Sequence, residues 1–321
     1  MNTSALDLRL GTGGYAFVTS IHAEPCSTDK KSIDTHSYPG HIMKLRYTPI
    51  QTPVLSVEAE ESEEHWHFQS PFSLEGRNVF VGELHSMLPV LASLLLKGEP
   101  NKRLVYIMDD QAAMYLSFSQ HVRELKKRIN LITITYGQAL GGDIEAINVY
   151  TALEAAVKVA KADHILITQG PGVIGTGTKR GFSGMQLVHW IHAIHSCQGK
   201  AIVIPRIQFA DHRERHCGLS HHTFHPLAFH TFTPVSIPFP IQSMETGSPL
   251  IEEDQLLKTQ FSRLIHLHHV IPISLHSFQR ELEQALAWYE KPIRTMGRNY
   301  LEEPYFFYAI GAAYYFYKEL V

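Results

Sequence analysis

The chain contains little cysteine and no apolar run at its start, and both features exclude classes of protein. Its three cysteines, Cys26, Cys197 and Cys217, are odd in number and lie far apart in the 321-residue sequence. Neither a disulfide framework nor a CxxC zinc or redox motif can be built from them, so a reducing cytoplasm is the expected location. The first ten residues also lack the basic start and continuous apolar stretch of a secretory signal.

The sequence has no excess of positive charge either. Its 28 lysines and arginines are outnumbered by 31 aspartates and glutamates, which gives a formal net charge of −3. Because nucleic acids and anionic membrane surfaces attract basic proteins, binding to either is disfavoured. The aromatic-rich stretch from Tyr305 to Tyr317 is too short to cross a bilayer. It predicts a helix that packs against other parts of the protein, or against a second copy at the interface of a homo-oligomer.

The chain does contain enough hydrophobic sequence for a folded core. Hydrophobic residues make up 44% of it and charged residues 18%, which fits one large domain or two modest ones. In the first 75 residues, short strand-like runs at Tyr15–Ile21, Ile42–Tyr47 and Val54–Val57 are separated by glycine and proline. This pattern predicts a small antiparallel β-rich region over residues 1–75.

From residue 78 onward, strand candidates alternate with helix candidates. The strands are expected at Val79–Leu84, Leu104–Met108, Leu131–Tyr136, His164–Gln169 and Ala201–Ile207, and the helices at Ser86–Lys97, Ala112–Arg128, Ile144–Ala162 and Gly184–Gln198. Such alternation is typical of a parallel sheet covered by helices. Later candidates are strands at Val235–Ile241 and near Val270, and helices at Glu252–His266, Phe278–Glu290 and Pro304–Leu320. The sequence therefore predicts an α/β domain over residues 76–321, with a Rossmann-like three-layer core, a mostly parallel sheet and a helical C-terminus.

The segments that follow the predicted strands should converge. Right-handed crossovers place the carboxyl ends of parallel strands at one edge of the sheet, where ligands bind in open α/β folds. The second strand ends in Asp109 and Asp110, and the third leads into the Gly141-Gly142 turn. Asp143 follows that turn and is expected to cap the next helix, because an aspartate at an N-cap accepts hydrogen bonds from free backbone N–H groups.

The fourth strand runs directly into a glycine-rich loop, residues 170–184. Glycines let backbone N–H groups approach a ligand closely, hydroxyls add donors, and two adjacent cations complement a phosphate or carboxylate. The loop is therefore predicted to bind an anion. The residues expected to hold it are Gly170, Gly172, Gly175, Thr176, Gly177, Thr178, Lys179 and Arg180.

The same glycines satisfy the GxGxxG spacing of a dinucleotide-binding loop. Two features argue against a nicotinamide site: the following helix starts only near Ser183, and the next strand ends in Gln208 without an acidic residue for the ribose. A Walker A motif cannot be aligned on these glycines. A general anion site is favoured, a dinucleotide site and a structural loop stay as alternatives, and the cofactor is left unassigned.

The fifth strand leads to the densest cluster of reactive side chains, residues 211–223. Asp211, Arg215 and His221 or His222 are the candidate catalytic residues. Three interpretations stay open: a metal site, metal-free acid–base or anion-binding chemistry, and a structural hydrogen-bonded loop. Adjacent histidines point in different directions on most backbones, so at most one of the two is expected to join Asp211, His216 or Cys217 around a metal.

Four motifs together resemble a known family. They are Leu10–Tyr15 (LGTGGY), Gly40–Pro49 (GHIMKLRYTP), Gly170–Gly177 (GPGVIGTG) and Gly218–Thr223 (GLSHHT). They are similar to the bacterial proteins grouped as domain of unknown function 3866, over nearly the whole chain. The resemblance implies no activity. It does imply an abbreviated start, because members carry a short β-rich segment ahead of the first motif.

These observations predict a bacterial cytoplasmic enzyme that acts on a small anionic substrate, such as a phosphorylated one. A non-catalytic anion or nucleotide sensor, or an interaction module, is the alternative, and a dinucleotide-dependent oxidoreductase is a weaker one. The leading hypothesis requires the glycine loop and residues 211–223 to face one pocket.

Overall fold

The computed structural model describes residues 2–5, 16–20, 42–46, 48, 51–110, 113–242 and 252–320. The Leu10–Tyr15 motif and Cys26 lie outside these residues. The central feature is an eight-stranded sheet with the order β14-β13-β10-β5-β9-β6-β7-β8, in which every neighbouring pair is parallel. Its strands are β5 (Asn78–Gly82), β6 (Arg103–Asp110), β7 (Asn130–Gly137), β8 (Ile144–Glu145), β9 (His164–Gln169), β10 (Lys200–Ile204), β13 (Ser236–Ile241) and β14 (His269–Ser274).

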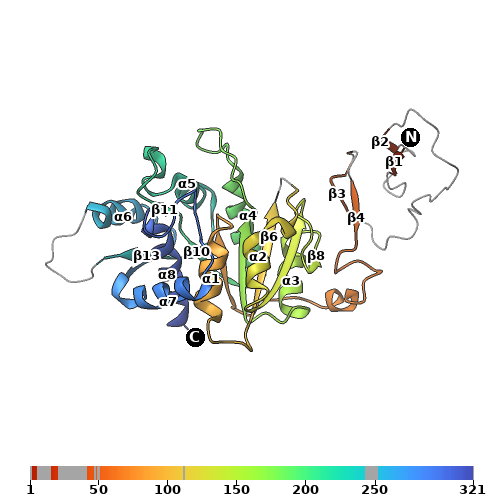
Figure 1. The fold of residues 1–321 in the computed structure, drawn as a ribbon, viewed down its shortest axis with the longest axis horizontal. Helices are drawn as coiled ribbons and strands as arrows, with labels where there is room; N and C mark the ends of the chain where they lie inside the picture. Colours follow the sequence, from red (N-terminus) through yellow and green to blue (C-terminus); the bar gives the residue numbers. More distant parts are fainter. Residues whose placement is uncertain are drawn as a thin grey trace.

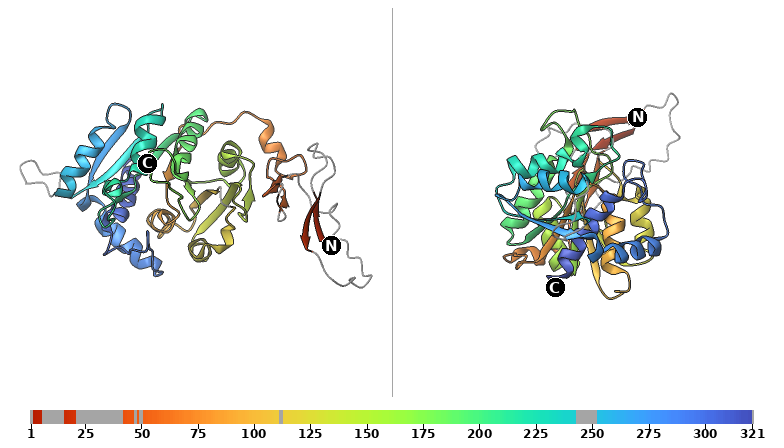
Figure 2. Two further views of the ribbon diagram at one scale, coloured as in Figure 1. Left: turned by 90° about the horizontal axis from the view of Figure 1, so that it is seen from above. Right: turned by 90° about the vertical axis from the view of Figure 1, so that its left-hand side faces the viewer.

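Helices cover both faces of this sheet, as the sequence predicts (Figures 1 and 2). One face carries α1 (Met87–Leu96), α2 (Gln120–Leu125), α7 (Gln279–Tyr289) and α8 (Pro304–Lys318), and the other carries α3 (Val149–Lys158), α4 (Gln186–Ser196), α5 (His221–His230) and α6 (Glu252–Ser262). The three-layer α/β architecture is thereby confirmed. The division of the chain at residue 75 stays a prediction.

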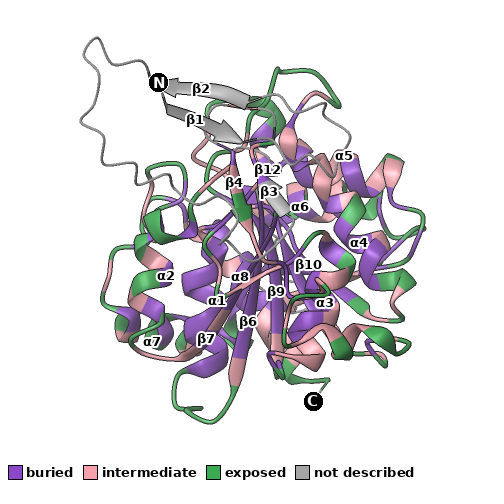
Figure 3. Cartoon of the chain, turned by 90° about the vertical axis from the view of Figure 1, so that its right-hand side faces the viewer, coloured by how far each residue is buried: buried purple, intermediate pink, exposed green. Residues whose placement is uncertain are grey.

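Two apolar cores form because the strands are buried on both faces (Figure 3). Along β5, Val79 and Val81 face the α3 and α4 side, whereas Phe80 packs with α1 and α8 on the other side. Alternate side chains of a strand point to opposite faces, so a strand between two helix layers must be apolar at every position. This explains the continuous hydrophobic runs in the sequence.

The aromatic stretch near the C-terminus is a packing helix, as predicted. In α8, Phe306, Phe307 and Ile310 are fully or nearly fully buried within the fold, and the helix packs against α1 and β13. Among the described residues, no helix combines the length and apolar character needed to cross a membrane.

Short antiparallel pairs precede the α/β core, in line with the predicted β-rich character of the first 75 residues. β1 (Asn2–Ala5) pairs with β2 (Ala16–Ser20), and β3 (Ile42–Lys44) pairs with β4 (Thr52–Val54). The segment after β4 is joined to the sheet edge, because the N–H of Val57 donates to the carbonyl of Glu145 over 2.8 Å.

Two predicted helices are wrong in extent. The segment 113–128 forms only a short 3-10 helix, η3 (Leu116–Phe118), and α2. The segment predicted as a helix from Ile144 begins instead as strand β8, and α3 starts at Val149. The expected capping by Asp143 is also wrong: its carboxylate accepts from the N–H and hydroxyl of Thr133 and pairs with Lys126. Backbone pairing with β7 has overridden the local helical pattern.

The residue that caps α3 is Asn148. Its side-chain oxygen accepts from the N–H groups of Tyr150 (2.8 Å) and Thr151 (3.1 Å), and the Thr151 hydroxyl completes a capping box. We expect Asn148→Ala to lower the free energy of unfolding by about 1 kcal/mol, because two N–H groups lose their acceptor. Urea unfolding measures this, with Asn148→Ser as the control that keeps an acceptor. An unchanged midpoint for Asn148→Ala would contradict the assignment.

Candidate functional site

Three adjacent central strands end at one edge of the sheet and position the candidate site. β5 lies between β9 and β10, and all three run in the same direction. Chain segments leave β5 toward one side of the sheet and β10 toward the other, which creates a crevice at their carboxyl ends. Glu83 follows β5, the glycine loop follows β9, and Arg206 follows β10.

A cavity of about 570 Å³ opens at this edge. Its wall includes residues from the glycine loop, such as Gly172 and Gly175, together with Arg215, His216 and His222 from the segment 211–223. The required juxtaposition of the two loops is therefore present. The chemical roles assigned to their residues stay predictions.

The glycine loop is folded back on itself and touches the histidines. The Ser183 hydroxyl closes its base by accepting from the N–H of Ile174 (3.1 Å) and the side-chain amide of Gln169 (2.8 Å). Gly172 has a φ of +98°, a conformation that favours glycine. A Cβ atom on Gly175 would lie 3.5 Å from Nε2 of His222, an ordinary contact distance, so the loop lies directly against the histidine.

Not all of the predicted anion ligands of the loop face the cavity. Gly170, Gly177 and Thr178 line it with the two glycines named above, whereas Thr176, Lys179 and Arg180 are not among the lining residues. The Thr176 hydroxyl is used within the loop, because it donates to the carbonyl of Gly181 over 2.9 Å. The anion-binding role of these three residues stays a prediction.

The positive charge at the cavity comes from other elements. Its described lining includes four arginines, Arg206, Arg213, Arg215 and Arg294, and no aspartate or glutamate. Arg206 pairs with Glu83, and Arg213 holds Asp211 through two side-chain hydrogen bonds of 2.9 and 2.7 Å. Arg215 is exposed and forms no ion pair or hydrogen bond with a described residue. Its guanidinium is thus available to a ligand.

Asp211, one of the predicted catalytic residues, does not project a reactive carboxylate into this cavity. The hydrogen bond from Arg213 holds the pKa of Asp211 well below its usual range, so the carboxylate is ionised and already paired. Its effect is to orient Arg213, which does line the cavity.

Glu83 is the centre of a buried polar network behind the cavity wall. Its Oε1 accepts from Arg206 Nη1 over 3.1 Å and from His222 Nδ1 over 3.0 Å, and its Oε2 accepts from the Thr223 hydroxyl over 3.3 Å. Burial alone would raise the pKa of Glu83, but Arg206 and His222 outweigh it and lower that pKa. The carboxylate is therefore ionised inside the protein.

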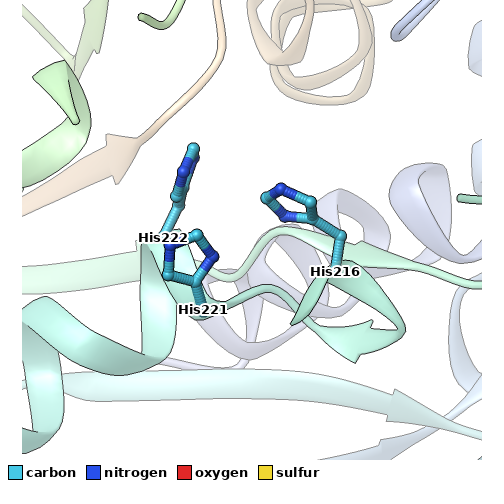
Figure 4. Close-up of side chains that lie close together, drawn as sticks. All are labelled: His216, His221 and His222. Atoms are coloured by element: carbon cyan, nitrogen blue, oxygen red, sulfur yellow. The ribbon is translucent and has the colours of Figure 1, made fainter. Parts of the chain in front are cut away.

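Three histidines gather at the start of α5 (Figure 4). His216 ends the short helix η5 (Glu214–His216), while His221 and His222 are the first two residues of α5. One ring nitrogen from each lies within 4.8 Å of those of the other two. The expectation that at most one of His221 and His222 could join such a group is wrong. The hairpin of β11 (Ile207–Gln208) and β12 (Gly218–Leu219) folds His216 back over the helix N-terminus, where both rings reach it.

Two of these histidines, His216 and His221, are neutral at pH 7. Burial, with a contribution from Arg206, lowers the pKa of His216 to about 3, and burial together with His222 lowers the pKa of His221 to about 4. The His222 ring is held flat against Phe182, with ring centres 4.1 Å apart and planes 5° apart. Closely spaced imidazoles next to a cavity can transfer protons or bind a metal.

A second hydrogen-bonded chain also reaches the cavity wall. The Thr168 hydroxyl donates to the carbonyl of Gln169, so the Tyr106 hydroxyl, 2.7 Å away, donates to Thr168. Tyr106 then accepts from Nδ1 of His85, which leaves Nε2 of His85 to accept from Ser119 over 2.7 Å. Burial and the nearby His121 lower the pKa of His85 to about 4. His85 is thus a neutral base in contact with a hydroxyl that also lines the cavity.

Sequence reasoning did not single out Glu83, His85, Ser119 or Arg206. A signal was available for two of them, because Glu83 and Arg206 are charged residues that end apolar runs of buried strands. Such a residue is expected to find a partner or a ligand. His85 and Ser119 carry no such signal, since each is one polar residue in a short connecting segment.

The fold and this cavity define an α/β protein with a ligand-type cavity at the carboxyl edge of a parallel sheet. The chain belongs to the family of proteins of unknown function DUF3866, whose model matches residues 1–314. Neither the curated proteins nor the solved structures include a significant match to the chain.

Proposed function

We propose that this protein is an enzyme that binds a small anionic substrate, a carboxylate or a phosphate, in the cavity beside the glycine loop. The observation that carries the proposal is the charge of the wall, which holds four arginines and no described acidic side chain. Arg206 and Arg213 are neutralised by their partners and Arg294 pairs with Glu302 (3.9 Å), so Arg215 is the guanidinium that pairs with the substrate. A planar guanidinium group can donate two parallel hydrogen bonds to two oxygens of one carboxylate or phosphate.

His85 supplies the acid–base chemistry in this proposal. It is neutral at pH 7 and contacts the Ser119 hydroxyl, and both residues line the cavity. Tyr106 fixes the ring through Nδ1, which keeps Nε2 as the proton acceptor. An oriented base next to a hydroxyl is the arrangement that acid–base catalysis requires. The segment 211–223 contributes Arg215, His216 and His222 to the same cavity wall.

Anion binding is tested with Arg215→Gln. We expect this variant to bind inorganic phosphate about 10- to 100-fold more weakly than the wild type, because a charge-assisted hydrogen bond is lost. Calorimetric titration measures the dissociation constants. Arg280→Gln is the matched control, because Arg280 is an exposed arginine of α7 that does not line the cavity. Equal phosphate affinity in the wild type and Arg215→Gln would contradict the role of Arg215.

Turnover is tested with p-nitrophenyl phosphate and p-nitrophenyl acetate, which release the same coloured product. If either is hydrolysed, we expect His85→Gln to lower kcat by about 100-fold or more, the usual contribution of a positioned base. Binding of phosphate without turnover of either ester would favour the alternative, a non-catalytic anion sensor.

The proposal places the enzyme in the bacterial cytoplasm, without a nucleic-acid or membrane partner. It is supported by the net charge of −3, by the few cysteines of the sequence, and by the free state of Cys197 and Cys217.

A homo-oligomer is also part of the proposal. Size-exclusion chromatography with light scattering measures the oligomeric state directly.

A further inference from the structure

The histidine group at the start of α5 has the composition of a metal site. His216, His221 and His222 lie together at the start of the helix, and each places one ring nitrogen within 4.8 Å of the other two (Figure 4). Imidazole nitrogens bind zinc and similar divalent ions at about 2.0–2.1 Å. Three histidines from a stretch of seven residues are brought together here by the β11–β12 hairpin and the first turn of α5.

Each of the three rings keeps one nitrogen that no hydrogen bond to a described residue occupies. Nδ1 of His222 donates to the Glu83 carboxylate, and Nδ1 of His216 lies 2.8 Å from the Ser220 hydroxyl. Both rings therefore keep Nε2 for a ligand. Metal-binding histidines commonly donate their second nitrogen to a carboxylate in this way, which fixes the ring and raises its basicity.

His221 adds an independent observation. Its Nδ1 atom is buried and has no hydrogen-bond partner among the described residues. A buried polar atom without a partner destabilises the folded protein. A bound metal ion would satisfy this nitrogen, and the neighbouring rings of His222 and His216 are only 4.3 and 5.2 Å away between ring centres.

We propose that His216, His221 and His222 bind a divalent transition-metal ion such as Zn²⁺, with an open coordination position toward the cavity. His216 and His222 line the cavity, whereas His221 is not among the lining residues, so the ion would lie in the wall. Three protein ligands and one open position are typical of catalytic rather than structural zinc. An ion there would polarise an oxygen of a bound anion. A role of the bound ion in turnover depends on the function proposed above, whereas metal binding itself does not.

Zinc titration of the chelator-treated protein tests the proposal. We expect one Zn²⁺ per chain in the wild type, and affinity lower by more than about 100-fold in His221→Ala, a larger loss than removal of an outer-shell partner causes. His225→Ala is the matched control, a histidine of the same helix outside the group. Circular dichroism confirms that each variant is folded. The proposal would be overturned if the wild type does not bind zinc, or if His221→Ala binds zinc as tightly as the wild type. It would also be overturned if His225→Ala loses as much zinc affinity as His221→Ala.

A second titration separates this proposal from the proposed function. Inorganic phosphate is added to the chelator-treated wild type and to the zinc-loaded wild type. Phosphate binding in a protein that takes up no zinc would overturn the metal site and leave the anion site standing. Zinc binding in a protein that never binds phosphate would support the metal site and contradict the anion site.

Discussion

Replacement of Glu83 by glutamine is expected to lower the free energy of unfolding by about 3–5 kcal/mol. The variant keeps the shape of the side chain but removes its charge, which leaves the Arg206 guanidinium buried without its counter-ion. Both side chains of the pair are only 2% exposed. Removal of one partner from a buried ion pair has this effect because the remaining charge stays out of water. Urea unfolding at pH 7 measures the loss.

The double variant Glu83→Gln/Arg206→Met is the control for this interpretation. Because it removes the stranded charge, we expect it to recover a large part of the stability that Glu83→Gln loses. A loss below about 1 kcal/mol in Glu83→Gln would contradict the buried ion pair. A double variant less stable than the sum of the two single changes would contradict the proposed cause.

Acidification is the second change with a large expected effect, and His85 is one of its sources, beside His216 and His221. Burial lowers the pKa of His85 from 6.5 to about 4 in the folded protein. Between these two pH values the unfolded chain binds more protons than the folded one, so the free energy of unfolding falls as the pH falls. A difference of that size corresponds to about 3 kcal/mol, present above pH 6.5 and lost by pH 4.

The variant His85→Gln isolates this contribution. Unfolding curves at pH 7 and pH 4 are compared for the wild type, for His85→Gln, and for His276→Gln, which changes an exposed histidine. We expect the loss between the two pH values to shrink by about 3 kcal/mol only in His85→Gln. If the free energy of unfolding falls by the same amount between pH 7 and pH 4 in all three proteins, the fold does not hold the His85 ring neutral.

The sheet and its helices could largely be predicted from the sequence. Strand β9 begins and ends at the predicted residues, His164 and Gln169, because a buried parallel strand reads as one apolar run bounded by turn residues. The order of strands could not be predicted. It places β9 between β5 and β6, although these two strands precede it in the chain. That arrangement depends on tertiary packing, which leaves no local pattern.

Helix α5 could not be predicted from the sequence, because it too depends on tertiary packing more than on a local pattern. Its sequence, HHTFHPLAFH, has no clear apolar stripe and contains Pro226 inside the helix. The helix forms because Ser220 caps it, with its hydroxyl accepting from the N–H of His222, and because Leu227 is fully buried against the core. The segment therefore reads as a loop of reactive residues, and its helical start is what brings His221 and His222 to the same place.

The site could be predicted in location but only partly in composition. Both loops that the sequence indicates do reach the cavity. The positive charge of the cavity wall comes from three arginines that follow β10 and from Arg294 after α7, whereas Lys179 and Arg180, the adjacent cations of the glycine loop, are outside the lining. The sequence shows which residues belong to the same loop. Which of their side chains face the cavity depends on the path that the loop takes in the folded protein.

The most direct test of the anion cavity is a crystal structure of the metal-free protein grown with inorganic phosphate. We expect a phosphate in the cavity, within hydrogen-bond distance of the Arg215 guanidinium and beside the loop from Gly170 to Thr178. An empty cavity in crystals where saturating phosphate binds at other surfaces would contradict it.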